Sequence, residues 1–305
     1  MSLKDYLAKR KKKKEIQKEK MKNMSFGEKI FSFGKTLIGA IIVVMIINGL
    51  LVASFVVPTG SMENEVMTGD FLFVNKFIYG PTTPQVIPFI NQELPFIQFP
   101  GIKDPEKGDV IVFIYPGDRD LIEAQEFQYY LKRCVATAGD TIQIINEVIY
   151  INGEKQPLPK NANFSSSNNP NAPAAFPIGT DWTQANYGPL VIPKEGDVIP
   201  ITRENIERWR IFILREGHKV TFDSETVFID DKPVTSYKVE RDYCFGMGDN
   251  RRNSLDSRSW GFIPYENVTG TPVIVYWSWD TNMPFGNFFD KLTTIRFNRI
   301  GNLID

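Results

Sequence analysis

Residues that commonly carry enzyme chemistry are scarce in this 305-residue chain. It contains two cysteines, Cys134 and Cys244, and a single histidine, His218. Two cysteines do not form a disulfide framework, and no set of cysteine and histidine has the spacing of a metal site. Both cysteines lie in segments typical of strands, and we expect two buried thiols. They could form a disulfide if those strands are neighbours. His218 lies in the polar turn "REGHKV", and we assign it no role.

Charged residues are missing between Thr36 and Val57. Residues 37–57 read "LIGAIIVVMIINGLLVASFVV", and a helix of this length spans roughly 30 Å, the thickness of a bilayer core. Twelve Lys and Arg against four Asp and Glu occur in residues 1–35, whereas residues 58–305 are net acidic. The positive-inside rule therefore predicts a basic cytoplasmic tail over 1–35, a transmembrane helix over 36–57 and an exported body over 58–305.

The apolar run has two alternatives to a membrane span. One is a buried core helix, although such helices are usually shorter. The second is a cleavable signal peptide, since "VAS" at 52–54 resembles a cleavage site, but the preceding basic region is too long for that. With an acidic body beside the run, the basic tail favours lipid headgroups as a partner over nucleic acid.

The body favours short strands over helices. Gly-Asp recurs ahead of alternating or apolar runs, where glycine supplies a turn and a strand follows. These turns begin at Gly69, Gly108, Gly139 and Gly196. The sequences "VIYINGEK" and "VFIDDKP" each predict a hairpin, and 203–216 is the best helix candidate. The predicted fold is therefore mainly β, a sandwich or barrel-like catalytic domain behind the transmembrane helix.

Two segments interrupt this pattern. Residues 156–178 are rich in Pro, Asn and Ser and predict a long loop, which fits a cap-like subdomain inserted at about 148–240. Residues 81–101 hold five prolines among apolar and aromatic residues, so they cannot form a central strand. We weigh a loop packed on the core against an apolar surface that dips into the membrane.

A serine follows the apolar run, in the stretch "VVPTGSMENEV". If Ser61 is a nucleophile it needs a general base, and with His218 discounted the candidate is a lysine. An ordinary lysine has a pKa of about 10.4 and stays protonated, whereas burial lowers that value. Lys132, within "FQYYLKRCVATAGD", lies in an apolar strand pattern, with Arg133 on the opposite face.

Three stretches in this order carry a family resemblance: "PTGSM", "YLKRCVATAGD" and "GDNRRNSLDSRSWGFIP". After an N-terminal span they closely resemble the bacterial type I signal peptidases, which are membrane-anchored Ser/Lys proteases. The resemblance covers about 36–145 and 240–300. It implies that Ser61 is the nucleophile, Lys132 the neutral general base and Ser254 a hydrogen-bond partner that orients the lysine. It also implies an oxyanion hole made by the Ser61 N–H and the Thr59 hydroxyl.

The resemblance assigns supporting roles to the third stretch. Asp256 and Arg258 would form an ion pair that holds this loop, and the turn before it would be fixed by Asp249, Asn250 and Arg251. There are two departures from the family. Thr59 stands where serine is common but keeps the hydroxyl. Arg252 stands where an acid is usual, which leaves a supporting salt bridge without its expected partner.

The function that this resemblance implies is removal of signal peptides from exported preproteins by a Ser61/Lys132 acyl-enzyme mechanism. It implies no metal and no cofactor, and a single-pass location in the cytoplasmic (inner) membrane with the catalytic domain on the outer face. Two alternatives remain, a different Ser/Lys protease of the same fold, such as the self-cleaving repressors, or a catalytically silent membrane-anchored β-protein.

Overall fold

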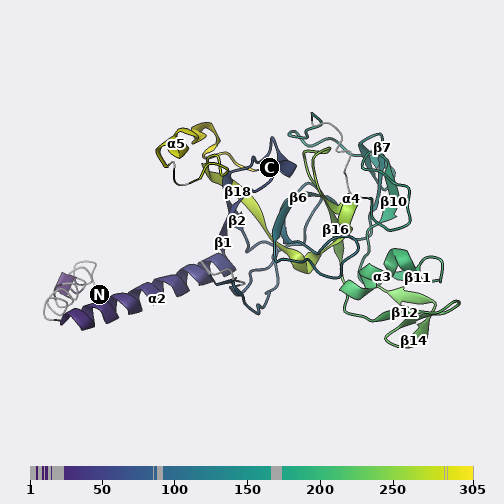
Figure 1. Ribbon diagram of the computed structural model, residues 1–305, viewed down its shortest axis with the longest axis horizontal. Helices are drawn as coiled ribbons and strands as arrows, with labels where there is room; N and C mark the ends of the chain where they lie inside the picture. Colours follow the sequence, from purple (N-terminus) through teal and green to yellow (C-terminus); the bar gives the residue numbers. More distant parts are fainter. Residues whose placement is uncertain are drawn as a thin grey trace.

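The computed structural model describes residues 24–304 apart from 85, 88–91, 166–173, 285 and 287, together with residues 5, 9, 11, 12 and 15. Most of the predicted basic tail therefore lies outside the described residues. The chain enters a long helix, α2 (Phe26–Leu50), which projects away from a β-rich body (Figure 1). Ser25 begins it with a capping box, since its hydroxyl accepts from the Glu28 N–H and the Glu28 carboxylate accepts from the Ser25 N–H.

Helix α2 is long and apolar enough to cross a membrane, and its most apolar stretch is not buried by the described protein. Its boundaries correct the predicted span of 36–57, because the helix begins ten residues earlier and ends at Leu50. The last residues of the apolar run instead form a strand, β1 (Val52–Val56), which pairs antiparallel with β2 (Asp70–Asn75). The β-branched residues of β1 suit an extended strand, and the sheet supplies it with hydrogen-bond partners.

The body is mainly β, as predicted. Within the described residues its main sheet has the order β1-β2-β18-β5-β6-β16-β17, and every neighbouring pair is antiparallel. The strands not yet given are β5 (Val110–Ile114), β6 (Tyr129–Ala136), β16 (Tyr243–Met247), β17 (Ile263–Pro264) and β18 (Val268–Ser278). Strands β2 and β5 begin soon after the Gly-Asp turns that predicted them, and β6 contains the lysine segment. The sheet therefore brings together strands that lie far apart in the sequence.

A smaller lobe lies beside the β16 end of the sheet (Figure 1). It contains one sheet of order β10-β7-β8-β9, two smaller sheets and helix α3 (Ile206–Arg215), which confirms the predicted helix. Its strands are β7 (Thr141–Ile145), β8 (Val148–Ile151), β9 (Glu154–Lys155), β10 (Tyr187–Val191), β11 (Val198–Pro200), β12 (Val220–Phe222), β13 (Val227–Ile229), β14 (Lys232–Val234) and β15 (Ser236–Lys238).

The lobe begins earlier in the chain than the predicted insertion at about 148. Strand β7 already belongs to its sheet, because it pairs with both β8 and β10. Both predicted hairpins are confirmed, and their turns have the positive φ angles that Asn-Gly and Asp-Asp tolerate, 53° and 82° at Asn152 and Gly153 and 50° and 62° at Asp230 and Asp231. One hydrophobic cluster runs from the lobe into β16, so the two parts share a core.

In the described part of the proline-rich segment there are two short strands, β3 (Val86–Ile87) and β4 (Gln92–Glu93), which pair with each other outside the main sheet. Phe96, Ile97 and Phe99 after them are 38%, 66% and 44% exposed. Residues 85 and 88–91 of this segment lie outside the described residues. The described parts of 156–178 hold no helix or strand, as predicted. Among the described residues there are also the helices η1 (Gly60–Met62), α4 (Ser257–Trp260), η2 (Tyr265–Asn267), α5 (Phe288–Thr293) and η4 (Phe297–Arg299).

Candidate active site

Ser61 lies on η1, a single helical turn that follows β1. A loop far along the chain holds this turn from behind. The backbone N–H of Asn250 donates to the Ser61 carbonyl at 3.0 Å, and the Asn250 side chain donates to the Gly60 carbonyl at 3.1 Å. The Asp249 N–H points at the sulfur of Met62 at 3.3 Å. Because the turn is fixed through its backbone, the Ser61 hydroxyl is left to face the neighbouring strand.

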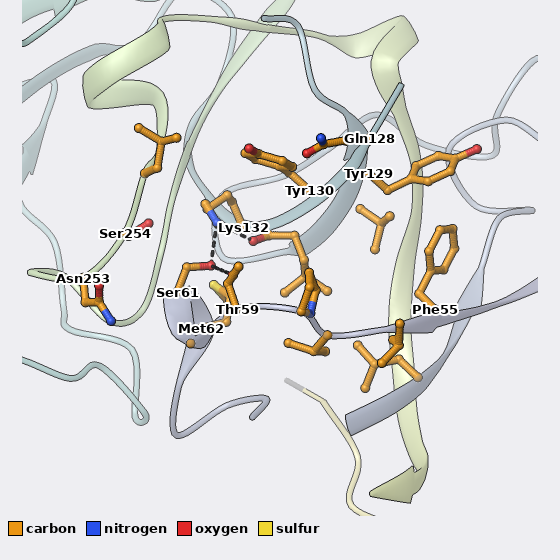
Figure 2. A pocket seen from close by; sticks show the side chains of 18 of the residues that line it. Phe55, Thr59, Ser61, Met62, Gln128, Tyr129, Tyr130, Lys132, Asn253 and Ser254 are labelled. Carbon is orange, nitrogen blue, oxygen red and sulfur yellow. Dashed lines mark hydrogen bonds between the residues drawn. The ribbon is translucent and has the colours of Figure 1, made fainter. Parts of the chain in front are cut away.

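Lys132 lies on that strand, β6, and meets the serine directly. Its Nζ donates to Ser61 Oγ at 2.7 Å and to the Leu131 carbonyl at 3.0 Å (Figure 2). Lys132 is only 3% exposed. Ser61 and Lys132 are 71 positions apart in the sequence, and the structure brings them together as expected. Their contact is the direct hydrogen bond that a nucleophile and its base require.

Burial sets the protonation of Lys132. Removal from water disfavours the ammonium form and lowers the pKa of Lys132 to about 8. The charge of Asp256 opposes this shift, and the charge of Arg258 adds to it. At a pH near 8, a large share of the lysine is therefore neutral and able to accept a proton from Ser61.

Two more hydroxyls lie in the neighbourhood of this pair. Thr59 Oγ1 donates to Ser61 Oγ at 3.4 Å, so the two hydroxyls lie on the same side of the turn. Ser254 behaves differently from the expectation, because its buried Oγ has no hydrogen-bond partner among the described residues. The expected bond to Lys132 is not formed, since the lysine Nζ is directed to Ser61 and to the Leu131 carbonyl instead.

Two glycines of the β16 segment allow this close approach. A Cβ at Gly248 would lie 2.2 Å from Ser254 Oγ and 2.5 Å from the Ser61 carbonyl oxygen. A Cβ at Gly246 would lie 3.1 Å from the Cβ of Lys132. Any side chain at Gly248 would therefore push apart the two segments that the active site brings together.

Buried ion pairs support the loop behind Ser61. The expected pair is present, since Arg258 donates to both carboxylate oxygens of Asp256 at 2.8 and 2.7 Å, and the Gly248 N–H donates to Asp256 at 3.1 Å. Asp249 pairs with Arg133, the neighbour of Lys132, at 2.7 Å. Arg133 also lies 3.6 Å from Glu65. These carboxylates thereby tie the loop to β6 and to the segment after η1.

Arg252, the departure from the family pattern, has a partner of its own. Its Nε and Nη2 donate to the two carboxylate oxygens of Glu147 at 2.8 and 2.9 Å. Sequence reasoning missed this pair, and also Arg133–Asp249, because the partners are 105 and 116 positions apart. Gly246 and Gly248 could have been noticed in the sequence, since they flank Met247 within "FGMGDN".

A cleft of ≈ 1020 Å³ opens in front of Ser61 and Lys132. It is lined by β1 with the residues that follow it, by the start of β6 and by residues 251–255, and the rings of Phe55 on β1 and Tyr129 on β6 have centroids 4.8 Å apart. Strand β1 is at the edge of its sheet and pairs only with β2 among the described strands. Its free edge can therefore accept an extended chain.

The two cysteines and the single histidine do not line this cleft. Cys134 on β6 and Cys244 on β16 are buried free thiols, as expected, and belong to one hydrophobic cluster. His218 is bonded to Asp230 at 2.7 Å and to Glu240 at 3.0 Å in the smaller lobe, and these carboxylates raise its pKa. In the described part of the chain, no group of three or more His, Cys, Asp or Glu side chains is placed to hold a metal ion.

Comparisons with known proteins identify the family of this chain. The family described as "Signal peptidase, peptidase S26" matches residues 30–277. A signal peptidase I of Helicobacter pylori is 30% identical over 266 residues, covering 84% of this chain and 85% of the relative. One from Pseudomonas aeruginosa is 28% identical and covers 82% of this chain and 73% of the relative. A crystal structure of a signal peptidase I from Enterococcus faecalis aligns with 18% identity over 55% of this chain and 97% of its own, but its TM-score of 0.25 does not establish a shared fold.

Proposed function

Because the chain belongs to the peptidase S26 family of signal peptidases, we propose that Ser61 and Lys132 carry out its hydrolysis of peptide bonds. The activity is that of signal peptidase I, a serine peptidase that acts on preproteins. The observation that supports the dyad is the 2.7 Å contact between Lys132 Nζ and Ser61 Oγ, made by a lysine that burial leaves largely neutral near pH 8.

The first step is attack on the scissile carbonyl. Neutral Lys132 accepts the Ser61 proton as Oγ bonds to the carbonyl carbon, and the carbonyl oxygen becomes an oxyanion. The Ser61 N–H and the Thr59 hydroxyl are the proposed donors to that oxyanion. Donors of this kind act in a site that excludes water, and removing one typically costs about 2.7–4 kcal/mol of transition-state stabilisation.

In the following steps Lys132 first donates a proton and then accepts one. As an ammonium ion, Lys132 gives its proton to the leaving amine, and the mature chain departs while Ser61 holds the signal peptide as an ester. Water then loses a proton to Lys132 and attacks the ester, which releases the signal peptide and restores Ser61. Burial favours this cycle because it keeps the lysine pKa close to the working pH.

The substrate would lie in the cleft as an additional strand. Its backbone would pair with the free edge of β1, and its side chains would alternate between the cleft floor and the opening. Small residues, typically alanine, are expected at the first and third positions before the cut, as the resemblance to the family implies. Apolar residues of β1 and β6 line the part of the cleft next to β1, among them Phe55, Tyr129 and Leu131.

The N-terminal apolar helix anchors the chain in a membrane. We propose that the basic tail over 1–35 stays in the cytoplasm and that the body lies on the outer face of the cytoplasmic membrane. The short distance in sequence from Leu50, where α2 ends, to Ser61 would keep the nucleophile near the membrane surface. Exposed Phe96 and Ile97 after the proline-rich strands are candidates for an additional lipid contact.

Cleavage of a purified preprotein by the full chain in detergent tests the proposed dyad. We expect Ser61→Ala and Lys132→Ala to lose preprotein processing while they remain folded, as judged by an unchanged thermal transition for the serine variant. Processing by either variant at close to the wild-type rate would refute the assignment. Failure of the wild-type chain to cleave any preprotein would refute the activity itself.

A further inference from the structure

The cleft is divided into two chemically different halves. On the β1 side its walls are apolar, whereas beyond Ser61 they are polar and come from the loop after Asn250. Figure 2 shows Asn253 and Ser254 on one side of Ser61 and Phe55 and Tyr129 on the opposite side. Among the described residues that line the cleft, the charged ones are Lys132, Arg251 and Arg252, and no carboxylate lines it.

The polar half is the side by which the mature chain would leave. Helix α2 ends at Leu50, and β1 begins at Val52, so the apolar half of the cleft is the half joined to the membrane helix. The apolar part of a signal peptide must lie on that same side. Residues after the scissile bond therefore extend past Ser61 toward Arg251 and Arg252.

Arg251 has a guanidinium without an acceptor. The residue is 3% exposed, and none of its three side-chain nitrogens has a hydrogen-bond partner within the described structure. The two aspartates whose charges act on it are already occupied, since Asp249 is held by Arg133 and Asp256 by Arg258. Burial also lowers the pKa of Arg251, as expected for a cation held away from water. A buried cation with unused donors is costly, so a substrate acceptor would stabilise a position of the Arg251 side chain that is turned toward the cleft which this residue lines.

Arg252 is the more exposed member of the pair. Glu147 neutralises it through two hydrogen bonds, and the side chains of Arg252 and Glu147 are 35% and 28% exposed. A guanidinium has five N–H donors, so Arg252 can keep Glu147 and bind a second carboxylate. Glu147 would then act as a counter-charge that weakens the attraction.

We propose that Arg251 and Arg252 form a subsite for the mature chain, and that this subsite favours an acidic side chain within the first few residues after the cut. This inference rests on the proposed signal peptidase activity. It names specificity-determining residues for that activity, on the side of the scissile bond opposite to the apolar half of the cleft.

The test uses one preprotein with Glu, Gln or Lys introduced singly at each of the first three positions after its cleavage site. For the full chain in detergent, we expect kcat/KM at one of these positions to be about fivefold higher with Glu than with Gln. The value with Lys should be the lowest. The differences should lie mainly in KM. High salt should reduce the preference. Equal values for all three residues at every position would overturn the subsite, whereas absence of any cleavage would overturn the proposed function.

Variants of the Arg252–Glu147 salt bridge are expected to change the preference for Glu over Gln in opposite directions. Arg252→Gln should reduce the Glu-over-Gln ratio toward one, and Glu147→Gln should increase it, because it removes the competing carboxylate. Arg210→Gln is a matched control, since it breaks an Arg–Glu pair of 3.3 Å on α3, outside the cleft lining. Ratios that stay unchanged in both cleft variants, or that change equally in the control, would overturn the role of Arg252.

Arg251 is tested by the conservative variant Arg251→Lys, which keeps a cation but loses the planar fork of donors. We expect the Glu-over-Gln ratio to fall in this variant while its thermal transition stays cooperative. An unchanged ratio in a folded protein would overturn the role of Arg251. If the variant fails to fold, the opposite shifts expected for Arg252→Gln and Glu147→Gln still decide the proposal.

Discussion

Arg133 binds both carboxylate oxygens of Asp249, since its single Nε–H is shared between them at 3.0 and 3.2 Å and its Nη2 donates to one of them at 2.7 Å. Arg133 follows Lys132 on β6, and Asp249 precedes Asn250, whose N–H holds the Ser61 carbonyl. The pair therefore joins the strand of the proposed base to the loop that holds the proposed nucleophile. Both side chains are buried, at 9% and 0% exposure, so little solvent screens their interaction.

Breaking this pair should destabilise the protein and misalign the dyad. Arg133→Met leaves the Asp249 carboxylate buried without its main partner, which typically costs about 3–5 kcal/mol of folding free energy. We expect a lower thermal transition and a loss of preprotein processing. Lys219→Met, which removes an exposed pair with Asp231, is the control and should leave the transition nearly unchanged. Equal transitions for Arg133→Met and wild type would contradict this view.

The rate should follow the protonation of Lys132. Burial lowers its pKa to about 8, and in the proposed mechanism the neutral form is active, so kcat/KM should rise with pH, reach half of its limit near pH 8 and level off about one pH unit higher. Arginine at this position stays charged and cannot act as a base, so Lys132→Arg should be inactive at every pH. The pH–rate profile on one preprotein is the measurement. A rise that is centred near pH 10, or turnover by the arginine variant, would argue against a buried lysine base.

The same shift predicts that Lys132 destabilises the fold. Its pKa lies below the unfolded value of 10.5, so the unfolded chain binds the extra proton between about pH 8 and 10.5. Stability should rise with pH through that window, and the cost is fully present below it. Lys132→Met should therefore raise the free energy of unfolding at pH 7, by about 3 kcal/mol at most. Thermal transitions followed by tryptophan fluorescence at pH 7 and pH 10 measure this. A gain that is no larger at pH 7 than at pH 10 would count against it.

Gly248→Ala should disrupt the site. The added Cβ would meet the Ser61 carbonyl oxygen at 2.5 Å, and this oxygen belongs to backbone that cannot move without shifting the Ser61 side chain. We expect preprotein processing to be lost and the thermal transition to fall. Gly286→Ala is the control, because a Cβ there has no neighbour within 4 Å. Normal activity in Gly248→Ala would show that the loop and η1 are not held as closely as described.

Local chemistry alone determined much of the architecture. The Gly-Asp turns, the period-two strand patterns, the two hairpins and helix α3 were predicted correctly, since each depends on residues close together in the sequence. The apolar run was correctly predicted to form a helix, but its end was misplaced. Val52–Val56 is as apolar as the helix before it, and only the pairing of those residues with β2 makes them a strand.

Tertiary structure decided the contacts of the site. Discounting His218 left a lysine as the candidate base, but the pattern around Lys132 was weak by itself, and the assignment of Ser61, Lys132 and their partner segments came from the resemblance to the family. The ion pairs of Arg133 with Asp249 and of Arg252 with Glu147, the unbonded Ser254 hydroxyl and the unpartnered Arg251 could not be predicted. Each depends on which side chains the folded sheet brings together from distant parts of the chain, and hydrogen bonding across such a separation leaves no periodic pattern in the sequence.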